Sequence, residues 1–589
     1  MKKNIRLQLM VCQGTGCISA DSKILLENLK DLVKEKKLYD VEVIKTGCFG
    51  FCGEGPIVKV YPDNIFYTKV KPEDAKEIVE EHILNGRAVE RLLYKNPATG
   101  KKIVNQHAMN FYEKQTRIAL RNCGLINPEE INEYIARDGY QALGQVLTKM
   151  TPEQVVEEII KSGLRGRGGG GFPTGIKWKT TLSSPGDEKY IFCNADEGDP
   201  GAFMDRSILE GDPHSVIEAM AIGGYATGAN QGVIYIRAEY PLAIHRLEVA
   251  IKQAKSYGLL GKNIFDSGFD FDIIIRYGAG AFVCGEETAL IHSVEGMRGE
   301  PTRKPPFPSI KGYLGKPTTV NNVETYANIP QIILKGADWY ASMGTEGSKG
   351  TKVFALAGNV NNIGLVEVPM GITIREIVYD IGGGIPNGKK FKGVQIGGPS
   401  GGMITKENLD TPIDYENLKA IGAMMGSGGL IVMDEDTDMV ELAKFYLEFT
   451  QDESCGKCTP CRIGTKRLLE MLTDLINQKS SLEKLPKIKS LCENIIETAA
   501  CGLGQTAPNP ILSTMRYFPE EYEKYAKGEV EKAYKIDPNK CIGCHRCAKN
   551  CPISCISGEI KKAHTIDKDK CIACGTCMGV CPVGAIIKP

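Results

Sequence analysis

Cysteine spacing constrains this chain more than any other feature. The sequence contains 21 cysteines, and eight of them form two similar runs near the C-terminus, each with the spacing C-x2-C-x2-C-x3-C-P. In this pattern three thiolates bind one 4Fe-4S cluster, and the fourth binds the cluster of the other run. We therefore expect one cluster on Cys541, Cys544, Cys547 and Cys581, and a second on Cys571, Cys574, Cys577 and Cys551. Zinc ribbons rarely use this spacing, which disfavours zinc here.

A third run, Cys455, Cys458 and Cys461, precedes a predicted helix over residues 463–476. Cys501 follows some 40 residues later and completes a set of four thiols. Helix amides and nearby cations stabilise thiolate charge, so we expect a third 4Fe-4S cluster here. The alternative is a group of buried structural cysteines.

The first 90 residues predict a small α/β domain of thioredoxin size. Strands are expected over 5–11, 39–45, 57–61 and 65–69, with helices over 21–36 and 72–84. Four cysteines follow the first two strands: Cys12, Cys17, Cys48 and Cys52. They suit a 2Fe-2S cluster, with zinc as the alternative. The spacing is not that of a C-x-x-C redox pair, which argues against thioredoxin activity.

Five cysteines remain. Cys123, Cys193 and Cys284 lie in apolar or glycine-rich contexts and are expected to be structural. Cys492, Cys555 and His564, with His545 nearby, suggest a zinc site; separate buried residues are the alternative.

Composition places the chain among soluble proteins. Its formal net charge is +0 at pH 7, which provides no overall field for nucleic acid or an acidic membrane surface. No apolar run approaches the length of a membrane helix, and no signal core follows the N-terminal residues. With its reduced-type cysteine pattern, the chain is expected to be cytoplasmic.

Glycines concentrate in four segments, where the backbone is expected to lie unusually close to another group. These segments are residues 163–175, 278–285, 382–402 and 426–429. The first group, from Ser162 to Gly175, cannot be the interior of a helix or strand. Its amides could hold a phosphate, and Lys177 adds a positive charge. The pattern is neither of the common nucleotide-binding glycine motifs, so a flexible loop is an equal alternative on this evidence alone.

Five ordered motifs carry a family resemblance. They are the glycine loop continued by residues 176–178, residues 194–201, residues 278–288, residues 303–308 and residues 321–325. Together with the cysteines at 455–461 and 501, they resemble the NADH- and FMN-binding subunit of respiratory complex I and its relatives in soluble hydrogenases and formate dehydrogenases. The resemblance covers roughly residues 120–525.

The resemblance implies a set of binding residues. FMN would be held by Gly166, Arg167, Gly168, Lys177, Asn194, Asp196, Glu286, Asn321, Asn322 and Thr325. NAD(H) would be positioned by Phe172 and Phe307, with Asp199, Glu287 and Lys304 around its polar groups. The family usually has Glu at Asp199, and some relatives have an aromatic residue at Thr180. A carboxylate such as Glu287 accepts from a ribose hydroxyl and repels a 2′-phosphate, which favours NAD over NADP. No side chain is needed as a general base, because hydride transfer is flavin chemistry.

We therefore predict a multidomain α/β and α+β protein. The expected parts are a thioredoxin-like 2Fe-2S domain (1–90), a linker (91–120), an FMN- and NADH-binding α/β domain (121–340), a small β-grasp-like (ubiquitin-like) domain (341–435), a helical bundle with a 4Fe-4S cluster (436–528) and a two-cluster ferredoxin domain (529–589).

A chain with a 2Fe-2S domain at its N-terminal end and a ferredoxin domain at its C-terminal end resembles the diaphorase subunit of soluble electron-bifurcating or NAD(P)-reducing iron hydrogenases. This implies a hetero-oligomer with a hydrogenase-type catalytic subunit and a small 2Fe-2S subunit, coupling H2, NAD(H) and ferredoxin. Residues 531–589 carry ten Lys/Arg against five Asp/Glu, which could dock an acidic ferredoxin or simply be a solvated surface. The alternatives are the same subunit in a formate dehydrogenase or complex I-like dehydrogenase, and a non-catalytic electron relay.

Overall fold

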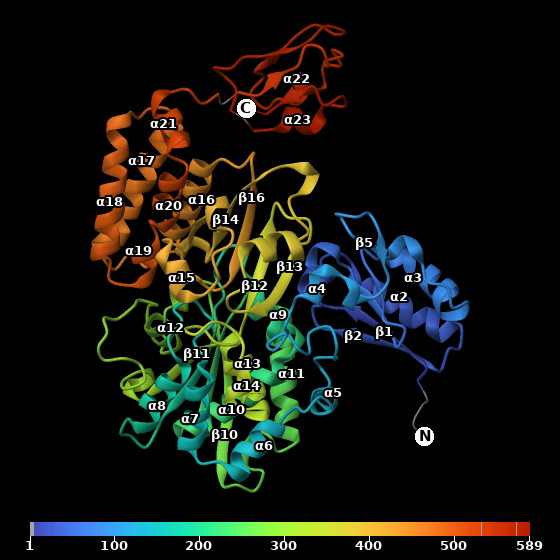
Figure 1. The fold of residues 1–589 in the computed structure, drawn as a ribbon, viewed down its shortest axis with the longest axis vertical. Helices are drawn as coiled ribbons and strands as arrows, with labels where there is room; N and C mark the ends of the chain where they lie inside the picture. Colours follow the sequence, from blue (N-terminus) through green and yellow to red (C-terminus); the bar gives the residue numbers. More distant parts are fainter. Residues whose placement is uncertain (1–4, 532, 573, 589) are drawn as a thin grey trace. The chain divides into compact units, whose positions relative to one another are not determined.

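The computed structural model describes residues 5–531, 533–572 and 574–588. The chain divides into two compact units (Figure 1). The larger unit is Met1–Glu470 with Lys487–Phe518, and the smaller is Met471–Pro486 with Pro519–Pro589. The larger unit therefore carries the N-terminal cysteines and the glycine-rich segments, and the smaller carries the two C-terminal cysteine runs.

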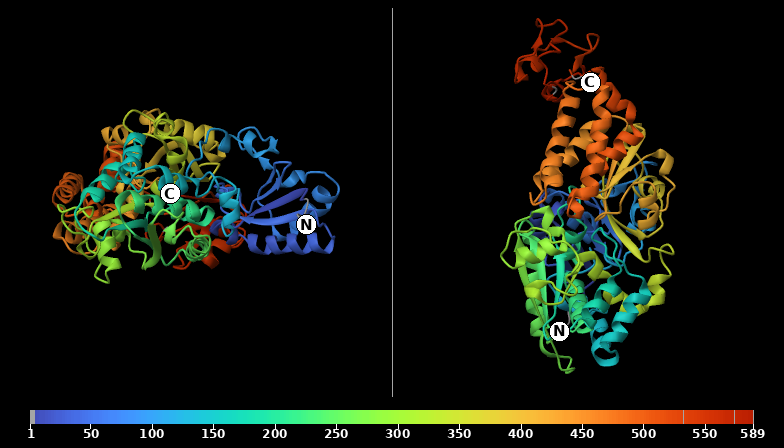
Figure 2. Two further views of the ribbon diagram at one scale, coloured as in Figure 1. Left: turned by 90° about the horizontal axis from the view of Figure 1, so that it is seen from below. Right: turned by 90° about the vertical axis from the view of Figure 1, so that its left-hand side faces the viewer.

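The N-terminal domain is a four-stranded sheet with helices. Its strands are β1 (Leu7–Cys12), β2 (Val41–Thr46), β3 (Val58–Tyr61) and β4 (Ile65–Tyr67), in the order β2-β1-β3-β4, with β1 and β2 parallel. Helix α2 (Ser22–Glu35) lies along the sheet (Figure 2) and buries Leu25, Leu26 and Leu29, which share one helical face. Residues 72–84 are also helical. The predicted strands and helices are confirmed within a few residues.

The linker connects two domains of the larger unit through packed aromatic rings. It contains the short strands β5 (Tyr94–Lys95) and β6 (Lys102–Ile103) and helix α4 (Asn110–Glu113). Phe111 stacks on Phe51 of the N-terminal domain, with ring centroids 4.2 Å apart. On the other side, the Tyr94 hydroxyl donates to Asn362 Oδ1 at 2.8 Å. The linker is therefore ordered structure rather than a flexible connection.

The central domain is built on four parallel strands. They are β7 (Tyr190–Ala195), β8 (Gln231–Arg237), β10 (Phe269–Gly278) and β11 (Thr318–Asn322), with β9 (Gly261–Ile264) antiparallel at one edge, in the order β11-β7-β8-β10-β9. Its helices are α5 (Ile131–Ile135), α6 (Gln141–Lys149), α7 (Pro152–Ser162), α8 (Thr174–Ser183), α9 (Met204–Gly211), α10 (Pro213–Thr227), α11 (Pro241–Ser256), α12 (Glu287–Val294), α13 (Val323–Lys335) and α14 (Ala337–Ala341). Helix α10 is rich in apolar residues and almost wholly buried, which places it inside the core (Figure 1). This α/β domain is as predicted.

The segment after the central domain is the predicted β-rich insert. It contains β12 (Thr351–Gly358), β13 (Gly364–Pro369), β14 (Phe391–Ile396), β15 (Gly402–Ile404), β16 (Gly429–Asp434) and helix α15 (Tyr415–Ala420). The sheet order is β13-β12-β16-β14-β15, and the first and last strands, β12 and β16, pair in parallel at its centre. This is the strand order of a β-grasp domain, as expected.

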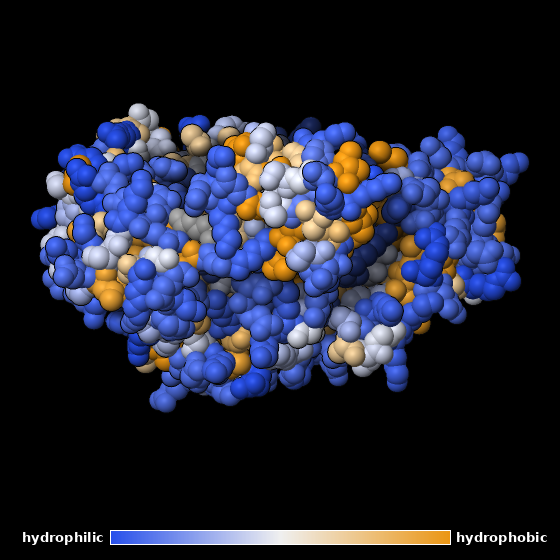
Figure 3. All heavy atoms as spheres, turned by 90° about the horizontal axis from the view of Figure 1, so that it is seen from above, coloured by the Kyte–Doolittle hydropathy of each residue, from blue (hydrophilic) through white to orange (hydrophobic). Residues whose placement is uncertain are grey.

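The chain then becomes helical. The helices are α16 (Met439–Asp452), α17 (Lys466–Ile476), α18 (Leu485–Thr498), α19 (Gly502–Thr506), α20 (Asn509–Tyr517) and α21 (Pro519–Lys527). The boundary between the two units runs through α17 and α18. Among the described residues, no helix is both long and apolar enough to cross a membrane. On the face drawn in Figure 3, hydrophilic side chains predominate and apolar atoms form separate small groups.

The end of the smaller unit repeats one short motif twice. Each half has a one-turn helix, α22 (Arg546–Asn550) or α23 (Thr576–Val580), that contains the third cysteine of its run. Two-residue strands pair as β17 (Lys535–Ile536) with β20 (Ile586–Ile587) and as β18 (Ile556–Ser557) with β19 (Thr565–Ile566). The internal repeat seen in the sequence is therefore also a structural repeat.

Candidate flavin site and cluster sites

The expected cofactor residues gather around one cleft of about 450 Å³ in the larger unit. Strands β7 and β11 are parallel neighbours, so the residues at their carboxyl ends reach the same edge of the sheet. Twelve of the fifteen expected residues line the cleft: Gly166, Gly168, Phe172, Lys177, Asn194, Asp196, Asp199, Glu286, Glu287, Lys304, Asn321 and Asn322.

The glycine loop is held in a fixed shape beside the cleft. Gly166 N donates to Phe172 O at 2.8 Å, and Tyr415 donates its hydroxyl proton to Gly166 O at 2.7 Å. Gly171 has a φ of +61°, and a Cβ there would lie 2.6 Å from the Tyr415 ring. Only glycine fits that position without strain. Helix α8 begins at Thr174, directly after the loop, so loop amides and helix N-terminus together favour an anionic group.

Two lysines and two glutamates form a compact charged group in the cleft. Lys177 donates to Val320 O at 2.9 Å and lies 3.1 Å from Glu287. Lys304 lies 2.6 Å from Glu287 and 2.9 Å from Glu286. Burial alone would raise the pKa of Glu287, but the two lysines outweigh it and hold that pKa below its usual value. Glu287 is therefore an ionised acceptor in a fixed position.

Asp196 is a buried carboxyl without a protein partner. Its side chain lies at the cleft, yet neither oxygen accepts a hydrogen bond from the described residues. Burial raises its pKa to about 7, in spite of Arg237. A buried acceptor of this kind is costly unless a ligand donates to it. A polyhydroxylated ligand with a phosphate, such as FMN, supplies hydroxyl donors for Asp196 and an anion for the loop, so the residues fit this cofactor.

Three expected residues lie outside the cleft lining. The Arg167 guanidinium donates to Thr351 O, Arg165 O, Lys349 O and the Tyr340 hydroxyl, and is therefore committed to structural contacts. Thr325 is buried and accepts from Arg167 N at 2.8 Å, which fixes the loop backbone. Phe307 is 50% exposed, similar to Phe172 at 53%.

Sequence reasoning did not assign several residues that complete the cleft. The β-grasp domain supplies Gly397, Ser400, Met424, Gly426 and Ser427, and α9 supplies Asp205. Ser427 donates to Asp199, which ties the two domains together across the cleft. Burial raises the pKa of Asp199 to about 6, although Ser427 opposes this. The glycine concentrations at 382–402 and 426–429 were the available signal, but they did not indicate which cleft they would reach.

The predicted third cluster site adjoins the cleft. Gly502 and Leu503, directly after Cys501, line the cleft. The Cys461 thiol lies within electrostatic range of Cys455, Cys458 and Cys501. Ser454 Oγ lies 3.2 Å from Cys461 Sγ, and burial raises the pKa of that thiol to about 11. A nearby cation, as iron would be, is needed to keep such a buried thiol ionised.

The four N-terminal cysteines also come together. Cys48 Sγ and Cys52 Sγ are 3.7 Å apart, and Cys12 interacts with both Cys17 and Cys48. These loops pack against α9 of the central domain, because Thr15 donates its backbone N–H to Glu210 Oε2 at 2.9 Å. Helix α9 therefore extends from Asp205 at the cleft to Glu210 at the N-terminal cysteines.

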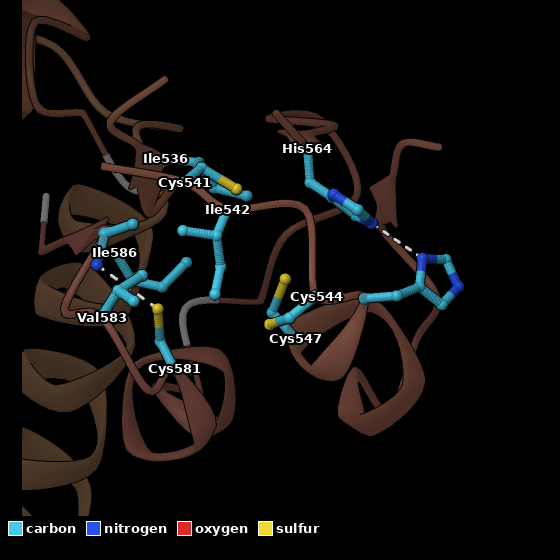
Figure 4. A pocket seen from close by; sticks show the side chains of 11 residues that line it. Ile536, Cys541, Ile542, Cys544, Cys547, His564, Cys581, Val583 and Ile586 are labelled. Atoms are coloured by element: carbon cyan, nitrogen blue, oxygen red, sulfur yellow. Dashed lines mark hydrogen bonds between the residues drawn. The ribbon is translucent and has the colours of Figure 1, made fainter. Parts of the chain in front are cut away.

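The C-terminal cysteines surround two separate cavities in the smaller unit. Figure 4 shows the first, which is lined by Cys541, Cys544, Cys547 and Cys581. The second is lined by Cys551, Cys571, Cys574, Cys577 and, in addition, Cys555. The fourth cysteine of each run thus lies with the first three of the other run, in the arrangement that the spacing predicted.

The residues suggested for zinc are divided between the two units. Cys492 is buried in α18 of the larger unit, whereas Cys555 and His564 belong to the smaller unit. His564 lines the first cavity and lies 2.7 Å from His545, while Cys555 lines the second. Among the described residues, no three His, Cys, Asp or Glu side chains are arranged to hold a single metal ion. Zinc stays a prediction without structural support.

Comparison with known proteins identifies the family. Four family models match separate parts of the chain. Residues 1–82 match the thioredoxin-like [2Fe-2S] ferredoxin family, and residues 159–331 match the Nuo51 FMN-binding domain. Residues 441–525 match the NADH-ubiquinone oxidoreductase-F iron-sulfur binding region, and residues 534–588 match the 4Fe-4S dicluster domain.

The NADP-reducing hydrogenase subunit HndC of Solidesulfovibrio fructosivorans is 63% identical over 76% of this chain and 92% of its own length. The F-type subunit of the NADH-quinone oxidoreductase of Aquifex aeolicus is 46% identical over 67% of this chain and 91% of its own. A crystal structure of an NAD+-reducing [NiFe]-hydrogenase in the air-oxidised state matches with a TM-score of 0.61 and 28% identity, covering 88% of this chain and 85% of the other. The chain therefore belongs to the family of FMN- and iron–sulfur-binding oxidoreductase subunits that includes the flavin-binding subunit of complex I.

Proposed function

We propose that the cleft binds FMN and NAD(H), and that the chain passes electrons from it through its own iron–sulfur clusters. The observation that carries this proposal is the continuity of the site. The glycine loop, Lys177 and the unpartnered Asp196 face one cleft, and the residues that follow Cys501 form part of its wall. When bound, FMN accepts a hydride and gives up single electrons.

The chain's own residues then have distinct roles. Loop amides and Lys177 would hold the phosphate, and Asp196 would accept hydrogen bonds from hydroxyl groups. Phe172 is exposed at the cleft and available for stacking on a nicotinamide nucleotide. Glu287, ionised between two lysines, would accept from a ribose hydroxyl. The protein's contribution is thus orientation, because the chemistry belongs to the cofactors.

We favour NAD(H) over NADP(H), although one relative is named NADP-reducing. Six carboxyl groups line the cleft with only two lysines: Asp196, Glu197, Asp199, Asp205, Glu286 and Glu287. Lys177 is assigned to the FMN phosphate, and Lys304 is paired with both Glu286 and Glu287. Among the described cleft residues neither lysine is therefore left for a 2′-phosphate, which this acidic surface would repel.

One predicted cluster site adjoins the flavin cleft, and a second is connected to it through helix α9. One is the quartet with Cys501. The other is reached along α9, whose Glu210 contacts the loop between Cys12 and Cys17. We propose that these give electrons two exits, in an electron-bifurcating hydrogenase that couples H2, NAD(H) and ferredoxin. The partners would be a hydrogenase-type catalytic subunit, a small 2Fe-2S subunit and ferredoxin, and the names of two relatives support a hydrogenase setting.

Dye reduction tests the flavin proposal. The chain, reconstituted anaerobically with iron, sulfide and FMN, should reduce a viologen dye with NADH. Lys177→Ala should lose FMN and activity, whereas Lys179→Ala, an exposed neighbour on the same helix, should retain both. Full FMN occupancy without NADH-dependent dye reduction would favour an electron relay instead.

Coupling is tested in the complete complex, purified with its partner subunits. Reduction of ferredoxin by H2 should require NAD+ if the two processes are coupled. Equal rates with and without NAD+ would exclude bifurcation while leaving the flavin proposal intact.

A further inference from the structure

The second C-terminal cavity contains one thiol more than a four-iron cluster needs. Five cysteines line it, and Cys555 is only 5% exposed. Its Sγ lies 3.4 Å from the Sγ of Cys551, the residue expected to be the fourth ligand. It also interacts with Cys571, an expected ligand from the other run. Cys555 is therefore among the ligands rather than elsewhere in the domain core.

The internal repeat supplies a comparison within the same molecule. Cys555 follows Cys551 by four residues, and Ala585 follows Cys581 by four. Both backbone N–H groups donate to the sulfur of the preceding cysteine, Cys555 N to Cys551 Sγ at 3.4 Å and Ala585 N to Cys581 Sγ at 3.3 Å. Figure 4 marks the second of these bonds with a dashed line.

The backbone before each position is also equivalent. Ser554 has a φ of +51° and Gly584 a φ of +60°. The two half-sites thus share their loop conformation and their N–H to sulfur bond. At the position that follows the fourth ligand by four residues, one half has the thiol of Cys555 and the other has the methyl of Ala585.

We infer that Cys555 is a reserve ligand of the second cluster, able to replace Cys551 on the iron that Cys551 binds. The exchange conserves charge and electrons. The bond between iron and Cys551 sulfur breaks, the bond between iron and Cys555 sulfur forms, and the Cys555 thiol proton moves to Cys551. The short separation of the two sulfurs means that the exchange needs little movement of the backbone. This inference rests on the proposed cluster ligands of the C-terminal domain.

The consequence is an asymmetry between the two clusters. The second cluster can lose its bond to Cys551 and keep four thiolate ligands. Among the described residues, the first cavity has no fifth cysteine, because Ala585 occupies the equivalent position. The second cluster is therefore the more resistant of the pair to loss of its fourth ligand.

The test uses the full chain, reconstituted anaerobically, with Cys551→Ala and Cys581→Ala as matched variants. Iron and sulfide contents, zinc content and the EPR spectrum of the reduced protein are measured for each. Cys551→Ala should retain the iron of both C-terminal clusters, with a shifted EPR signal from the second. Cys581→Ala should lose iron from the first cluster, either one iron or the whole cluster.

Two further variants isolate the role of Cys555. The double variant Cys551→Ala with Cys555→Ala should lose iron from the second cluster to the same extent as Cys581→Ala loses it from the first. Adding Ala585→Cys to Cys581→Ala should restore iron to the first cluster, because it recreates the same geometry. Cys555→Ala alone should keep its full iron content.

Several outcomes overturn the inference. Equal iron loss in Cys551→Ala and Cys581→Ala would show that Cys555 cannot substitute. Loss of zinc in Cys555→Ala would show that this thiol is committed to a different metal. By contrast, unchanged iron in both Cys581→Ala and the double variant would mean that the proposed ligand assignment itself is wrong.

Discussion

Replacing Asp196 by Asn should have opposite effects on the FMN-free and the FMN-bound protein. Both carboxylate oxygens of Asp196 are buried, and no described protein group donates a hydrogen bond to them. Burial raises the pKa of this carboxyl from 3.8 to about 7. A shift of this size corresponds to about 4 kcal/mol of free energy lost when the group is ionised in the folded state.

The sign of the pH dependence follows from this direction. Because the folded-state pKa lies above the unfolded-state value, the folded protein holds the proton more tightly, and stability from this group is complete below about pH 4. It is lost as the pH rises to about 7. Without FMN, Asp196→Asn should remove this dependence and raise the melting temperature at pH 8 by roughly 3–4 °C, because the larger unit has a large unfolding entropy.

With FMN the effect reverses. Hydrogen bonds from ligand hydroxyls to a charged carboxylate contribute about 1.5–3 kcal/mol, so losing the charge should weaken FMN binding by roughly 10- to 150-fold. Flavin fluorescence titration measures the affinity, and thermal unfolding of the FMN-free protein measures the stability. Asp187→Asn, at an exposed position, is the control. If Asp196→Asn were less stable than the parent at pH 8 and bound FMN equally well, the argument from the unpartnered carboxylate would be refuted.

Three further variants test other contacts. Gly171→Ala should destabilise the protein by about 1–3 kcal/mol and weaken FMN binding, because the added Cβ would meet the Tyr415 ring. Gly170→Ala is the control: open space surrounds that position, so the same assays should show neither effect. Lys352→Met leaves the buried Glu324 without its cation and should lower the free energy of unfolding by about 3–5 kcal/mol, as measured by thermal unfolding. If adding Glu324→Gln recovered none of that free energy, the broken ion pair would not be the cause of the loss. Lys304→Ala removes contacts to both cleft glutamates and should raise KM for NADH about 10-fold or more, with FMN content unchanged; an unaltered KM would argue against a place near the nucleotide.

The sequence predicted the strands whose apolar and polar residues alternate and the helices whose apolar residues recur with helical periodicity. Strand β1 and helix α2 follow directly from the spacing of their apolar residues. The cysteine spacing also indicated which C-terminal thiols would share a cavity, because in this pattern the fourth cysteine of each run joins the first three of the other run. The order of the motifs predicted most of the residues that line the cleft, because residues at the carboxyl ends of parallel strands meet at one edge of the sheet.

The rest depends on tertiary packing that no local pattern records. Arg167 has the sequence context of a phosphate ligand, yet its guanidinium is held by four acceptors on the other side of the loop. Ser427 reaches Asp199 only because the β-grasp domain packs against the cleft. The absence of partners around Asp196 is likewise a property of the assembled cleft. The sequence suggested Cys555 as a zinc ligand, whereas its short distance from Cys551 is a property of the folded domain.

The most direct test is an anaerobic titration of the reconstituted chain with NADH, followed by optical and EPR spectroscopy. FMN should bind at one equivalent, and NADH should then reduce the cluster held by Cys455, Cys458, Cys461 and Cys501, with no reduction in FMN-free protein. An intact cluster that NADH fails to reduce in flavin-loaded protein, or a chain that retains no flavin, would contradict the account.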